Sequence, residues 1–301
     1  MTEETLIELL KTEYGIENAA LEFLRETGGR VYAVKGEKKY LLKLIGKAFA
    51  DNARRSVAVT RYLEQNGFPV PKTVLTGSGE AVAEVFAEDE DRLIMLQEYI
   101  EGDEPDLTVR AAEVGELVGR FHCLMEKYPG GTVTRDKYYF IDKYLEFLRR
   151  KNCPKLAAYE ELGGRLWEKV KDLPQGNCHG DLHRGNLLEN PDGKIYFIDF
   201  DTVSRAPMMF DISVMCDMTD YFRLKEEDIA VTRNVYRQFM SGYSQHRRPG
   251  PGEIQSFPYW VAVRHFQLQE VIMEIYGINC NDERFDDAQL DWLYGWLDRW
   301  Q

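Results

Sequence analysis

The 301-residue sequence has few cysteines and no long hydrophobic run. Its five cysteines are odd in number and widely scattered, without a C-x-x-C pair, which predicts neither a disulfide framework nor a zinc site. No apolar run approaches the roughly 18 residues of a transmembrane helix. The amino terminus, MTEETLIELLKTEYG, is typical of an acidic amphipathic helix rather than of a signal peptide. We therefore expect a cytoplasmic protein without a membrane partner.

Basic residues are also in short supply. The 38 Lys and Arg against 51 Asp and Glu give a net charge of −13. Surfaces that bind nucleic acid need clustered Lys and Arg, so this balance argues against a nucleic-acid partner. A hydrophobic share of 44%, with 12% aromatic residues, argues against disorder and can fill a sizeable core. The length allows two packed units or one large domain.

The first 98 residues show a mixture of helix and strand patterns. A short amphipathic helix precedes three strands that are bounded by Gly or charged turn residues. A helix from about Asn52 to Gln65 follows, and two more strands bracket residues 77–79 and end in the apolar run 93–96. The first three predicted strands are Leu21–Arg25, Arg30–Lys35 and Lys39–Ile45.

From residue 99 onward, helical periodicity dominates, and the exception is a strand-like island at residues 187–200. This pattern predicts an α+β fold in which a small β-rich lobe, residues 1–98, is joined near residues 97–102 to a larger helical lobe, residues 99–301. The sequence contains neither an internal repeat nor a low-complexity tract.

A hairpin is predicted inside the strand-like island. Two strand-like stretches flank the turn sequence N-P-D-G at residues 190–193, and Asp-Gly is a strong signal for a two-residue turn. Such a turn would pair Leu187 with Ile198 and place Asn186 opposite Asp199. Directly opposed side chains lie roughly 4.5–5.5 Å apart at Cβ, a suitable separation for two ligands of one cation. A longer turn around the proline would shift this register by a residue.

Oxygen-bearing side chains in residues 177–211 follow a kinase-like spacing. Asp181 and Asn186 reproduce the D-x-x-x-x-N pattern in which the Asp accepts the substrate hydroxyl proton and the Asn binds Mg²⁺. Asp199, followed by Phe200, stands where the metal-binding Asp of D-F-G stands. Phosphoryl transfer needs hard oxygen ligands for Mg²⁺ and one carboxylate aimed at the nucleophile. The alternative is a polar turn and a hairpin with incidental acids.

The sequence H-G-D-L-H-R-G-N-L-L, followed by F-I-D-F-D, resembles the aminoglycoside phosphotransferase and choline kinase family of protein-kinase-like enzymes. The resemblance is most specific over residues 177–213, weaker over residues 28–124, and fades in the carboxy-terminal helices. It implies a two-lobed protein-kinase-like fold with the cleft between the lobes. It also implies transfer of a phosphoryl group from ATP, with Mg²⁺, to a hydroxyl of a small molecule.

Roles follow from the resemblance for the matching positions. Asp181 is implied to be the catalytic base, and His179 is implied to orient the catalytic loop. Asn186 and Asp199 are implied to hold Mg²⁺. Asp211, in F-D-I, matches the buried family aspartate that braces the catalytic loop.

His122 ends a G-R-F-H tract that is similar to the family's helix ending in Leu-His. A histidine in that place is expected to be a hydrogen-bonded core residue rather than a ligand. We therefore leave His122 out of the predicted site.

The nucleotide site is predicted in the amino-terminal lobe. Lys43 lies mid-strand between apolar neighbours, which is unusual for a lysine, and it matches the kinase lysine that contacts nucleotide phosphates. The alternative is an outward-facing lysine on an alternating strand. Gly28 and Gly29 fall where a phosphate-covering loop would lie, although two glycines in a turn are a weak signal. Gln97 to Tyr99 match the hinge that pairs adenine through backbone groups.

Two departures from the family pattern bear on this site. The family glutamate that pairs with the lysine would fall near Ser56, and no acid occurs between Asn52 and Arg61. The sequence therefore leaves open which acid, if any, pairs with Lys43. Asp201 occupies the position of the D-F-G glycine, where it would either touch a second metal or the acceptor, or cap the following turn.

The acceptor site is the least specified. A stripe of aromatic residues at helical spacing near the carboxy terminus is typical of a core, and a cation-binding aromatic box is the alternative. Acids in the same region would favour an acceptor that carries an amine. The aromatic residues are Tyr259, Trp260, Tyr276, Trp292, Trp296 and Trp300. The acids are Asp217, Asp220, Glu270, Glu274, Asp282, Glu283, Asp286 and Asp287.

The predicted function is an ATP- and Mg²⁺-dependent kinase that acts on an amino alcohol, aminoglycoside, amino acid or sugar. A protein Ser/Thr kinase is one alternative, although the H-R-D loop, the D-F-G glycine and the A-P-E segment are missing. A nucleotide-binding pseudokinase is the other, and the intact set of Asp181, Asn186 and Asp199 argues against it.

Overall fold

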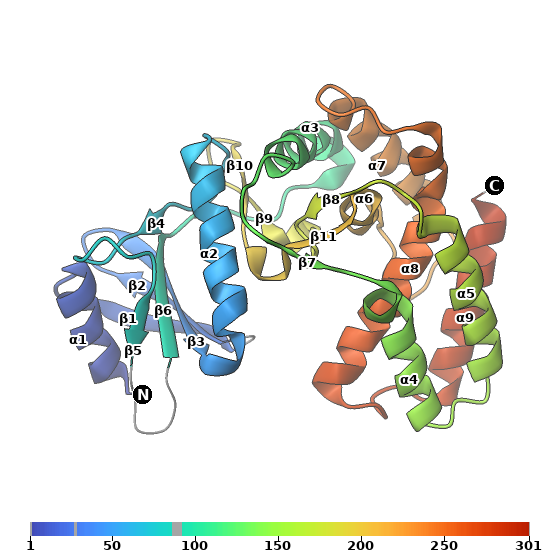
Figure 1. Cartoon of the computed structure of the whole chain (residues 1–301), viewed down its shortest axis with the longest axis horizontal. Coiled ribbons are helices and arrows are strands. Elements are labelled where there is room, and N and C mark those ends of the chain that lie inside the picture. Colours follow the sequence, from blue (N-terminus) through green and yellow to red (C-terminus); the bar gives the residue numbers. More distant parts are fainter. Residues whose placement is uncertain (1, 27–28, 86–91, 301) are drawn as a thin grey trace. The chain divides into compact units, whose positions relative to one another are not determined.

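The computed structural model describes residues 2–26, 29–85 and 92–300 (Figure 1). Contacts between residues divide the chain into two compact units. Unit 1 comprises Met1–Pro105, Tyr128–Gly130 and Gly185–Val203, and unit 2 comprises Asp106–Lys127, Gly131–Arg184 and Ser204–Gln301. This division differs from the expected boundary at residues 98 and 99, because the segment 185–203 packs with the amino-terminal unit.

An antiparallel sheet of six strands forms the centre of unit 1. The strand order is β1-β2-β3-β6-β4, and β5 also pairs with β6. The strands predicted in residues 21–45 are confirmed to within one residue at each end, and so is a strand through the apolar run 93–96. The strands are β1 Ala20–Glu26, β2 Arg30–Lys35, β3 Lys39–Gly46, β4 Thr73–Val74, β5 Ala83–Val85 and β6 Arg92–Glu98.

Two helices, α1 (Glu3–Tyr14) and α2 (Ala50–Gln65), cover the two faces of this sheet (Figure 1). Ile94 of β6 lies in an apolar cluster with Leu6 of α1, whereas Met95 lies in a second cluster with Val57 of α2. Successive side chains of a strand point to opposite faces. A strand that is buried on both faces therefore reads as a continuous apolar run rather than as an alternating one.

The predicted hairpin forms, but its register is one residue away from the predicted one. Strand β9 (Leu187–Glu189) pairs with β10 (Ile195–Phe197), and Leu187 lies opposite Phe197. The N–H of Ile198 donates to the carbonyl of Asn186 at 3.0 Å. The predicted pairing of Leu187 with Ile198, and of Asn186 with Asp199, is therefore wrong.

The cause of the shifted register is the length of the turn. The N–H of Asn190 donates to the carbonyl of Lys194 at 3.0 Å, which leaves residues 191–193 in the loop. Gly193 adopts a left-handed backbone conformation with φ of 79°. Three-residue hairpin loops commonly combine a turn with a residue in this conformation, usually Gly. The loop is therefore one residue longer than the two-residue loop that Asp-Gly alone would favour.

Helices make up most of unit 2, as predicted. A π-helical turn (Tyr138–Asp142) leads directly into α4, and α8 packs against that turn and against α4, α5, α6 and α9. Trp260 of α8 is fully buried between the rings of Phe140 and Phe210. The helices are α3 Leu107–Met125, α4 Lys143–Arg150, α5 Leu156–Val170, α6 Met209–Cys216, α7 Asp228–Tyr243, α8 Pro251–Tyr276 and α9 Glu283–Arg299.

A three-stranded sheet in unit 2 was not predicted. Its strands β7 (Val133–Thr134), β11 (Ser204–Pro207) and β8 (Gln175–Cys178) lie in the order β7-β11-β8. The expectation that residues 187–200 are the one strand-like exception after residue 99 is therefore wrong. These strands have two to four residues, too few to show the alternation of apolar and polar side chains that marks a strand. They also contain Gly and Pro, which are rare in strands. The sheet matters because β8 leads directly into His179.

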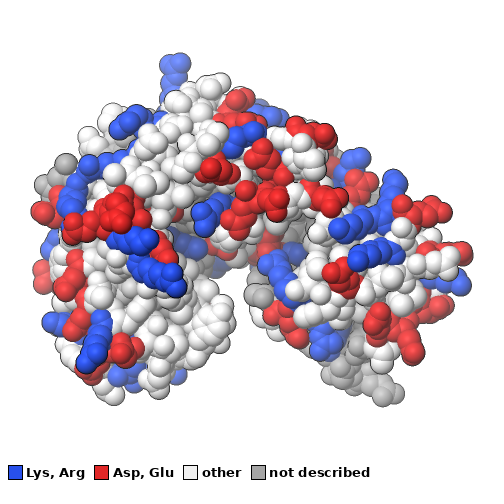
Figure 2. All heavy atoms as spheres, turned by 180° about the vertical axis from the view of Figure 1, so that it is seen from behind, with Lys and Arg blue, Asp and Glu red and all other residues white. Residues whose placement is uncertain are grey.

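Charged side chains of both signs are interspersed over the surface shown in Figure 2. None of the helices in residues 2–26, 29–85 and 92–300 combines the length and the hydropathy needed to cross a bilayer.

Helices α3 and α7 pack closely because glycines lie at their contact. A Cβ atom on Gly115 of α3 would overlap the backbone of Phe239, and one on Gly242 of α7 would overlap the carbonyl of Ala112. Backbone atoms cannot rotate away as the end of a flexible side chain can. The two helices must therefore separate to accept any side chain at either position.

We predict that Gly242→Ala lowers the free energy of unfolding by about 1–3 kcal/mol, the usual cost of overpacking a tight contact. Urea denaturation measures the change. Gly164→Ala on α5 is the matched control, because nothing lies within 4 Å of a Cβ placed there. It should be neutral or stabilising by up to about 1 kcal/mol, since Ala is the better helix former. Equal stability of Gly242→Ala and the unmodified chain would contradict the packing argument.

Candidate active site

Lys43 is held inside unit 1 by two carboxylates. Leu42 of β3 lies in the cluster under α1, so its neighbour Lys43 points to the other face of the sheet, the face that α2 covers. The Lys43 side chain is 11% exposed, and its Nζ lies 2.9 Å from Asp199 Oδ1 and 3.5 Å from Asp201 Oδ2. The structure therefore does not support the alternative of an outward-facing lysine.

Asp199 is paired with a second cation as well. Arg25 Nη2 donates to Asp199 Oδ2 at 3.1 Å, so each carboxylate oxygen has its own cationic donor. Asp199 adopts a left-handed backbone conformation with φ of 65°, which Asp tolerates better than most residues. Asp199 follows the last paired residue of β10, Phe197, by two positions. The two ion pairs fix the direction of its carboxylate.

These ion pairs outweigh the effect of burial on both partners. Burial by itself lowers the pKa of Lys43, but the carboxylates of Asp199 and Asp201 raise the pKa above its usual value. Burial by itself raises the pKa of Asp199, but Lys43 and Arg25 hold that pKa below its usual range. Both groups therefore stay charged around neutral pH.

The pairing answers the question that the missing helix glutamate left open. Ser56 is 2% exposed on α2, and its carbonyl accepts a hydrogen bond from the Thr60 hydroxyl at 2.9 Å. Lys43 takes its carboxylate partners from the segment after β10 instead of from α2. In this chain, one residue, Asp199, thus serves as the partner of the lysine and as the predicted metal ligand.

A cavity of about 220 Å³ in unit 1 brings the predicted nucleotide residues together. Lys43 and Asp199 line it together with Gln97 and Tyr99. Its remaining lining is largely apolar and comes from β1, β2, β3, Pro71, the segment 98–102, and the β9–β10 hairpin with the residue that follows it. An apolar cavity with a few convergent polar groups is the usual form of a small-molecule site. The apolar residues of the lining are Leu24, Val31, Leu41, Pro71, Ile100, Leu188 and Ile198.

The hinge residues are anchored to the sheet. Gln97 is 8% exposed and pairs with Leu41 of β3. The N–H of Tyr99 donates to the carbonyl of Lys39 at 3.1 Å, and the Lys39 ammonium lies 3.8 Å from the centre of the Tyr99 ring. The predicted adenine-facing segment is therefore a fixed edge of the cavity.

Of the two glycines in the predicted phosphate loop, the structure describes one, Gly29. Gly28 lies outside the described residues. Gly29 has φ of 143°, and a Cβ there would lie 2.6 Å from the carbonyl oxygen of Leu44. Position 29 therefore requires a glycine, both for its positive φ and for its close approach to β3. Gly29 does not line the cavity. Its role toward phosphate stays a prediction.

In unit 2, the carboxylate of Asp211 holds the start of the predicted catalytic loop. Asp211 is fully buried on α6, and its carboxylate accepts the N–H of His179 at 2.7 Å and the N–H of Gly180 at 3.0 Å. Gly180 has φ of 87°, a conformation that favours glycine. His179 is fully buried beside the Phe121 ring. The carboxylate of Asp211 therefore fixes the first two N–H groups of the loop that follows β8.

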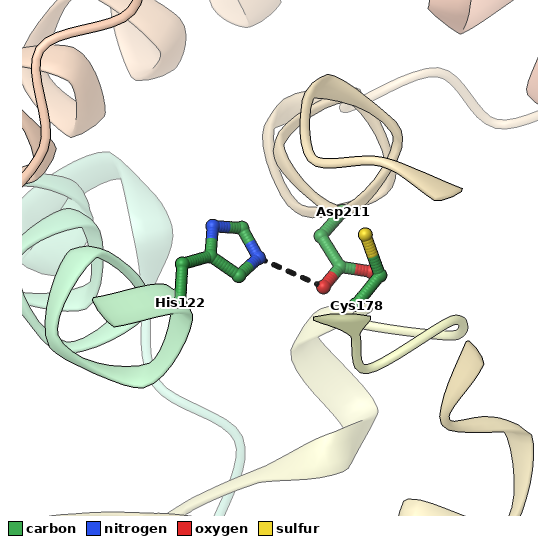
Figure 3. Close-up of side chains that lie close together, drawn as sticks. All are labelled: His122, Cys178 and Asp211. Carbon is green, nitrogen blue, oxygen red and sulfur yellow. Dashed lines mark hydrogen bonds and ion pairs between the residues drawn. The ribbon is translucent and has the colours of Figure 1, made fainter. Parts of the chain in front are cut away.

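His122, Cys178 and Asp211 lie close enough together to suggest a metal site, and Figure 3 shows them side by side. Hydrogen bonds account for the cluster instead. His122 lies 3.1 Å from Asp211 through Nε2 and 2.8 Å from the Tyr243 hydroxyl through Nδ1. The Cys178 thiol donates to the carbonyl of Ala206, and burial raises its pKa, whereas a metal ligand would be a thiolate. His122 is a core histidine, as expected.

Asp181 is partly exposed and has a cationic partner that the sequence did not predict. Its side chain is 34% exposed, and Arg264 Nη2 donates to Oδ1 at 2.9 Å. His183 Nε2 lies 3.6 Å from Oδ2. Arg264 itself is 9% exposed on α8, where a further donor of its guanidinium reaches Gln267. A buried arginine 83 residues from its partner leaves no local signal in the sequence.

The residues that were predicted to hold Mg²⁺ have a suitable chemistry. Asn186 and Asp199 offer an amide and a carboxylate oxygen, the donor types that Mg²⁺ prefers. Asp201 adds a carboxylate whose Oδ1 is buried and has no hydrogen-bond partner among the described residues. Asp201 lies inside the short helical turn Phe200–Thr202, and no side chain caps that turn. The oxygen set fits a hard cation, and the unsatisfied Asp201 oxygen favours a ligand over a turn cap.

Several acids that were grouped near the predicted acceptor site are already neutralised. Lys143 lies 2.6 Å from Glu270 and 2.9 Å from Glu274, and Lys151 lies 2.6 Å from Asp286. Burial raises the pKa of Asp217 to about 6, against hydrogen bonds from Tyr221 and Thr219. Among the aromatic residues, three tryptophans are nearly or fully buried, as expected for a core stripe; these are Trp260, Trp292 and Trp296.

Comparison with solved structures shows the fold. The chain resembles the amicoumacin kinase hAmiN, solved in complex with AMP-PNP, Ca²⁺ and Ami, with a TM-score of 0.79 at 19% identity over 99% of this chain and 94% of that one. It also resembles a microcompartment-associated aminopropanol kinase, with a TM-score of 0.76 at 18% identity over 98% and 95% of the two chains. These likenesses confirm the predicted kinase-like fold.

Sequence comparison shows the family. A homoserine kinase of Methylobacillus flagellatus is 25% identical over 192 residues, which cover 62% of this chain and 59% of that protein. Residues 21–250 match the model of the phosphotransferase enzyme family, APH. This match covers the sheet and cavity of unit 1, the hairpin with Asp199, and the catalytic loop with Asp211. The chain therefore belongs to the phosphotransferase enzyme family.

Proposed function

We propose that this phosphotransferase is a Mg²⁺-dependent kinase that moves the γ-phosphoryl group of ATP to a hydroxyl of a small molecule. The observation that carries the proposal is the ion pair between Lys43 and Asp199 at the wall of an apolar cavity. The pair joins a phosphate-binding cation to a metal-binding anion in one place. Nucleotide complexes of similar folds, such as hAmiN with AMP-PNP and Ca²⁺, support the same assignment.

In unit 1, the cavity would take the nucleobase. Gln97 and Tyr99 line one edge of the cavity, and their backbone groups would pair with adenine. Lys43 lines the same cavity and would contact the phosphates. Asn186 and Asp199 would hold Mg²⁺, with Asp201 as a further oxygen donor. When bound, the ion would neutralise the charge that develops on the β- and γ-phosphate oxygens.

In unit 2, Asp181 would accept the proton of the attacking hydroxyl. Its partial exposure leaves a carboxylate that a substrate can reach, and the hydrogen bond from Arg264 orients it. Asp211 and His179 would act indirectly, since they fix the backbone that carries Asp181. A base must lie within hydrogen-bond reach of the proton it takes, so a fixed loop contributes directly to the rate.

The acceptor is the least constrained part of the proposal. An amine on the acceptor is supported by the acidic composition of the chain and by the aminopropanol kinase among its structural relatives. The internal lysine partners of Glu270 and Asp286 weaken the argument from local acids. The amine therefore stays a prediction.

The test is release of ADP from Mg²⁺–ATP across a panel of amino alcohols, amino acids, aminoglycosides, sugars and a generic peptide substrate. The mass of the product identifies the acceptor. Phosphorylation of the peptide alone would favour the protein Ser/Thr kinase. Nucleotide binding without any turnover would favour the pseudokinase.

We predict that Asp181→Asn lowers kcat by roughly 10²- to 10⁴-fold, the usual contribution of general acid–base catalysis. The affinity for ATP should change only a few-fold, because the base acts in the transition state and not in nucleotide binding. Steady-state kinetics and calorimetric titration measure the two effects. Asp291→Asn, on the exposed side of α9, is the control for loss of one carboxylate. Retention of more than about a tenth of the activity would remove Asp181 from the role of base.

We predict that Asp199→Ala abolishes the Mg²⁺ dependence of nucleotide binding and lowers the rate, because it removes a charged ligand and the main partner of Lys43. Calorimetric titration of ATP with and without Mg²⁺ measures the change. Asp192→Ala, at the exposed turn of the same hairpin, should behave like the unmodified chain. An unaltered Mg²⁺ dependence in Asp199→Ala would move the metal site elsewhere, with Asp201 as the first candidate.

A further inference from the structure

Arg135 is a partly buried cation that pairs with no carboxylate of the described residues. It follows β7, and its N–H donates to the carbonyl of Arg205 at 2.9 Å. Its guanidinium carbon lies 4.1 Å from the centre of the Tyr139 ring. The Arg135 Nε is shielded from solvent, and no hydrogen-bond partner for it occurs in the part of the chain that the structure describes. No described carboxylate lies within 4.0 Å of its guanidinium nitrogens.

This arrangement sets Arg135 apart from the other arginines of unit 2. Exposed arginines without an acid are ordinary, because water solvates them. Buried ones pair: Arg264 with Asp181, and Arg247 with Glu253 at 3.0 Å. Removing a guanidinium from water costs free energy, and hydrogen bonds or ion pairs within the protein usually offset that cost. At Arg135, the shielded Nε has no such bond among the described residues. Such a group is suited to an anion that the chain itself does not supply.

A chain of side chains connects Arg135 to the predicted base. Arg264 donates to Asp181 and to Gln267, and the amide of Gln267 lies 3.4 Å from the hydroxyl of Tyr139. Burial raises the pKa of Tyr139, and both Arg135 and Arg264 oppose that rise, so both cations act on the same hydroxyl. Arg135 therefore belongs to the side-chain network around Asp181. Tyr139 also lies on a π-helical turn, a distortion that is frequent at functional sites.

We propose that Arg135 binds a carboxylate of the acceptor while the acceptor hydroxyl faces Asp181. The inference rests on the proposed kinase function, since the hydroxyl has to reach the base. A planar guanidinium presents paired N–H donors that match the two oxygens of a carboxylate. The Tyr139 ring lies against the guanidinium of Arg135. Together with the predicted amine, this selects hydroxy amino acids over amino alcohols and neutral sugars.

Three matched pairs of acceptors isolate the carboxylate. Serine is compared with ethanolamine, threonine with 1-aminopropan-2-ol, and homoserine with 3-aminopropan-1-ol, so each pair differs by the carboxylate alone. We predict that the better hydroxy amino acid has a kcat/KM at least tenfold above that of its amino alcohol. Arg135→Gln should lower that kcat/KM by about 10- to 100-fold, mainly through KM, which is the usual size of a charged hydrogen bond. The KM for ATP and the values for the amino alcohol should stay within about threefold.

Two further variants control for charge and fold. Arg165→Gln removes an exposed arginine of α5 and should leave all values unchanged. Arg135→Lys keeps the charge but loses the paired donors, so it should recover part of the loss. Thermal unfolding verifies that each variant is folded, and calorimetric titration of the hydroxy amino acid without nucleotide measures binding apart from turnover.

Several outcomes would overturn the role of Arg135. The first is a kcat/KM for an amino alcohol that equals or exceeds that of its hydroxy amino acid. The second is an Arg135→Gln variant that loses kcat/KM equally for both members of a pair, or that loses only its affinity for ATP. The third is binding of the hydroxy amino acid that is unchanged in Arg135→Gln. Turnover confined to neutral sugars would overturn it while leaving the kinase standing. A chain that binds Mg²⁺–ATP but releases no ADP with any acceptor would refute the proposed function, and the titration would still decide whether Arg135 binds carboxylate.

Discussion

The buried carboxylate of Asp211 is the constraint on which the catalytic loop depends. It is fully removed from solvent and accepts the N–H groups of His179 and Gly180 and the imidazole of His122. An isolated carboxylate in that place would be strongly unfavourable, and these donors offset the cost. Since two of these donors are backbone groups of the loop, the interactions that make the burial of Asp211 tolerable also fix where the chain turns toward Asp181.

Unit 1 follows the same principle with opposite charges. Lys43 is nearly buried on β3 and depends on Asp199, whose second oxygen depends on Arg25. Each unit supplies partners for these charges from its own residues, so each presents these groups in a fixed geometry. Catalysis by positioning and electrostatics benefits from such preorganisation, because the groups need little rearrangement when substrates bind.

Much of the fold and of the site could be predicted from the sequence, and the limits have physical causes. The strands of residues 20–46 carry a recognisable pattern and were predicted correctly. The H-G-D-x-x-x-x-N spacing predicted the family that the sequence comparison shows, and the catalytic roles of its residues stay predictions. The hairpin register depended on one backbone conformation at Gly193, and the sheet of β7, β8 and β11 consists of strands too short to show a pattern. The partner of Lys43 was missed because tertiary contacts bring it from a distant segment, not from α2.

The same limit applies to charge. A net charge of −13 favours a cationic acceptor when it is treated as a property of the whole surface. Inside unit 2, however, Lys143 neutralises Glu270, and Arg264 lies against Asp181. Coulomb interactions in a partly desolvated site are dominated by neighbours within a few ångströms, because solvent and salt screen the rest. Under our proposal, Arg135, whose guanidinium pairs with no carboxylate of the described residues, would therefore influence the choice of acceptor more than the excess of surface acids does.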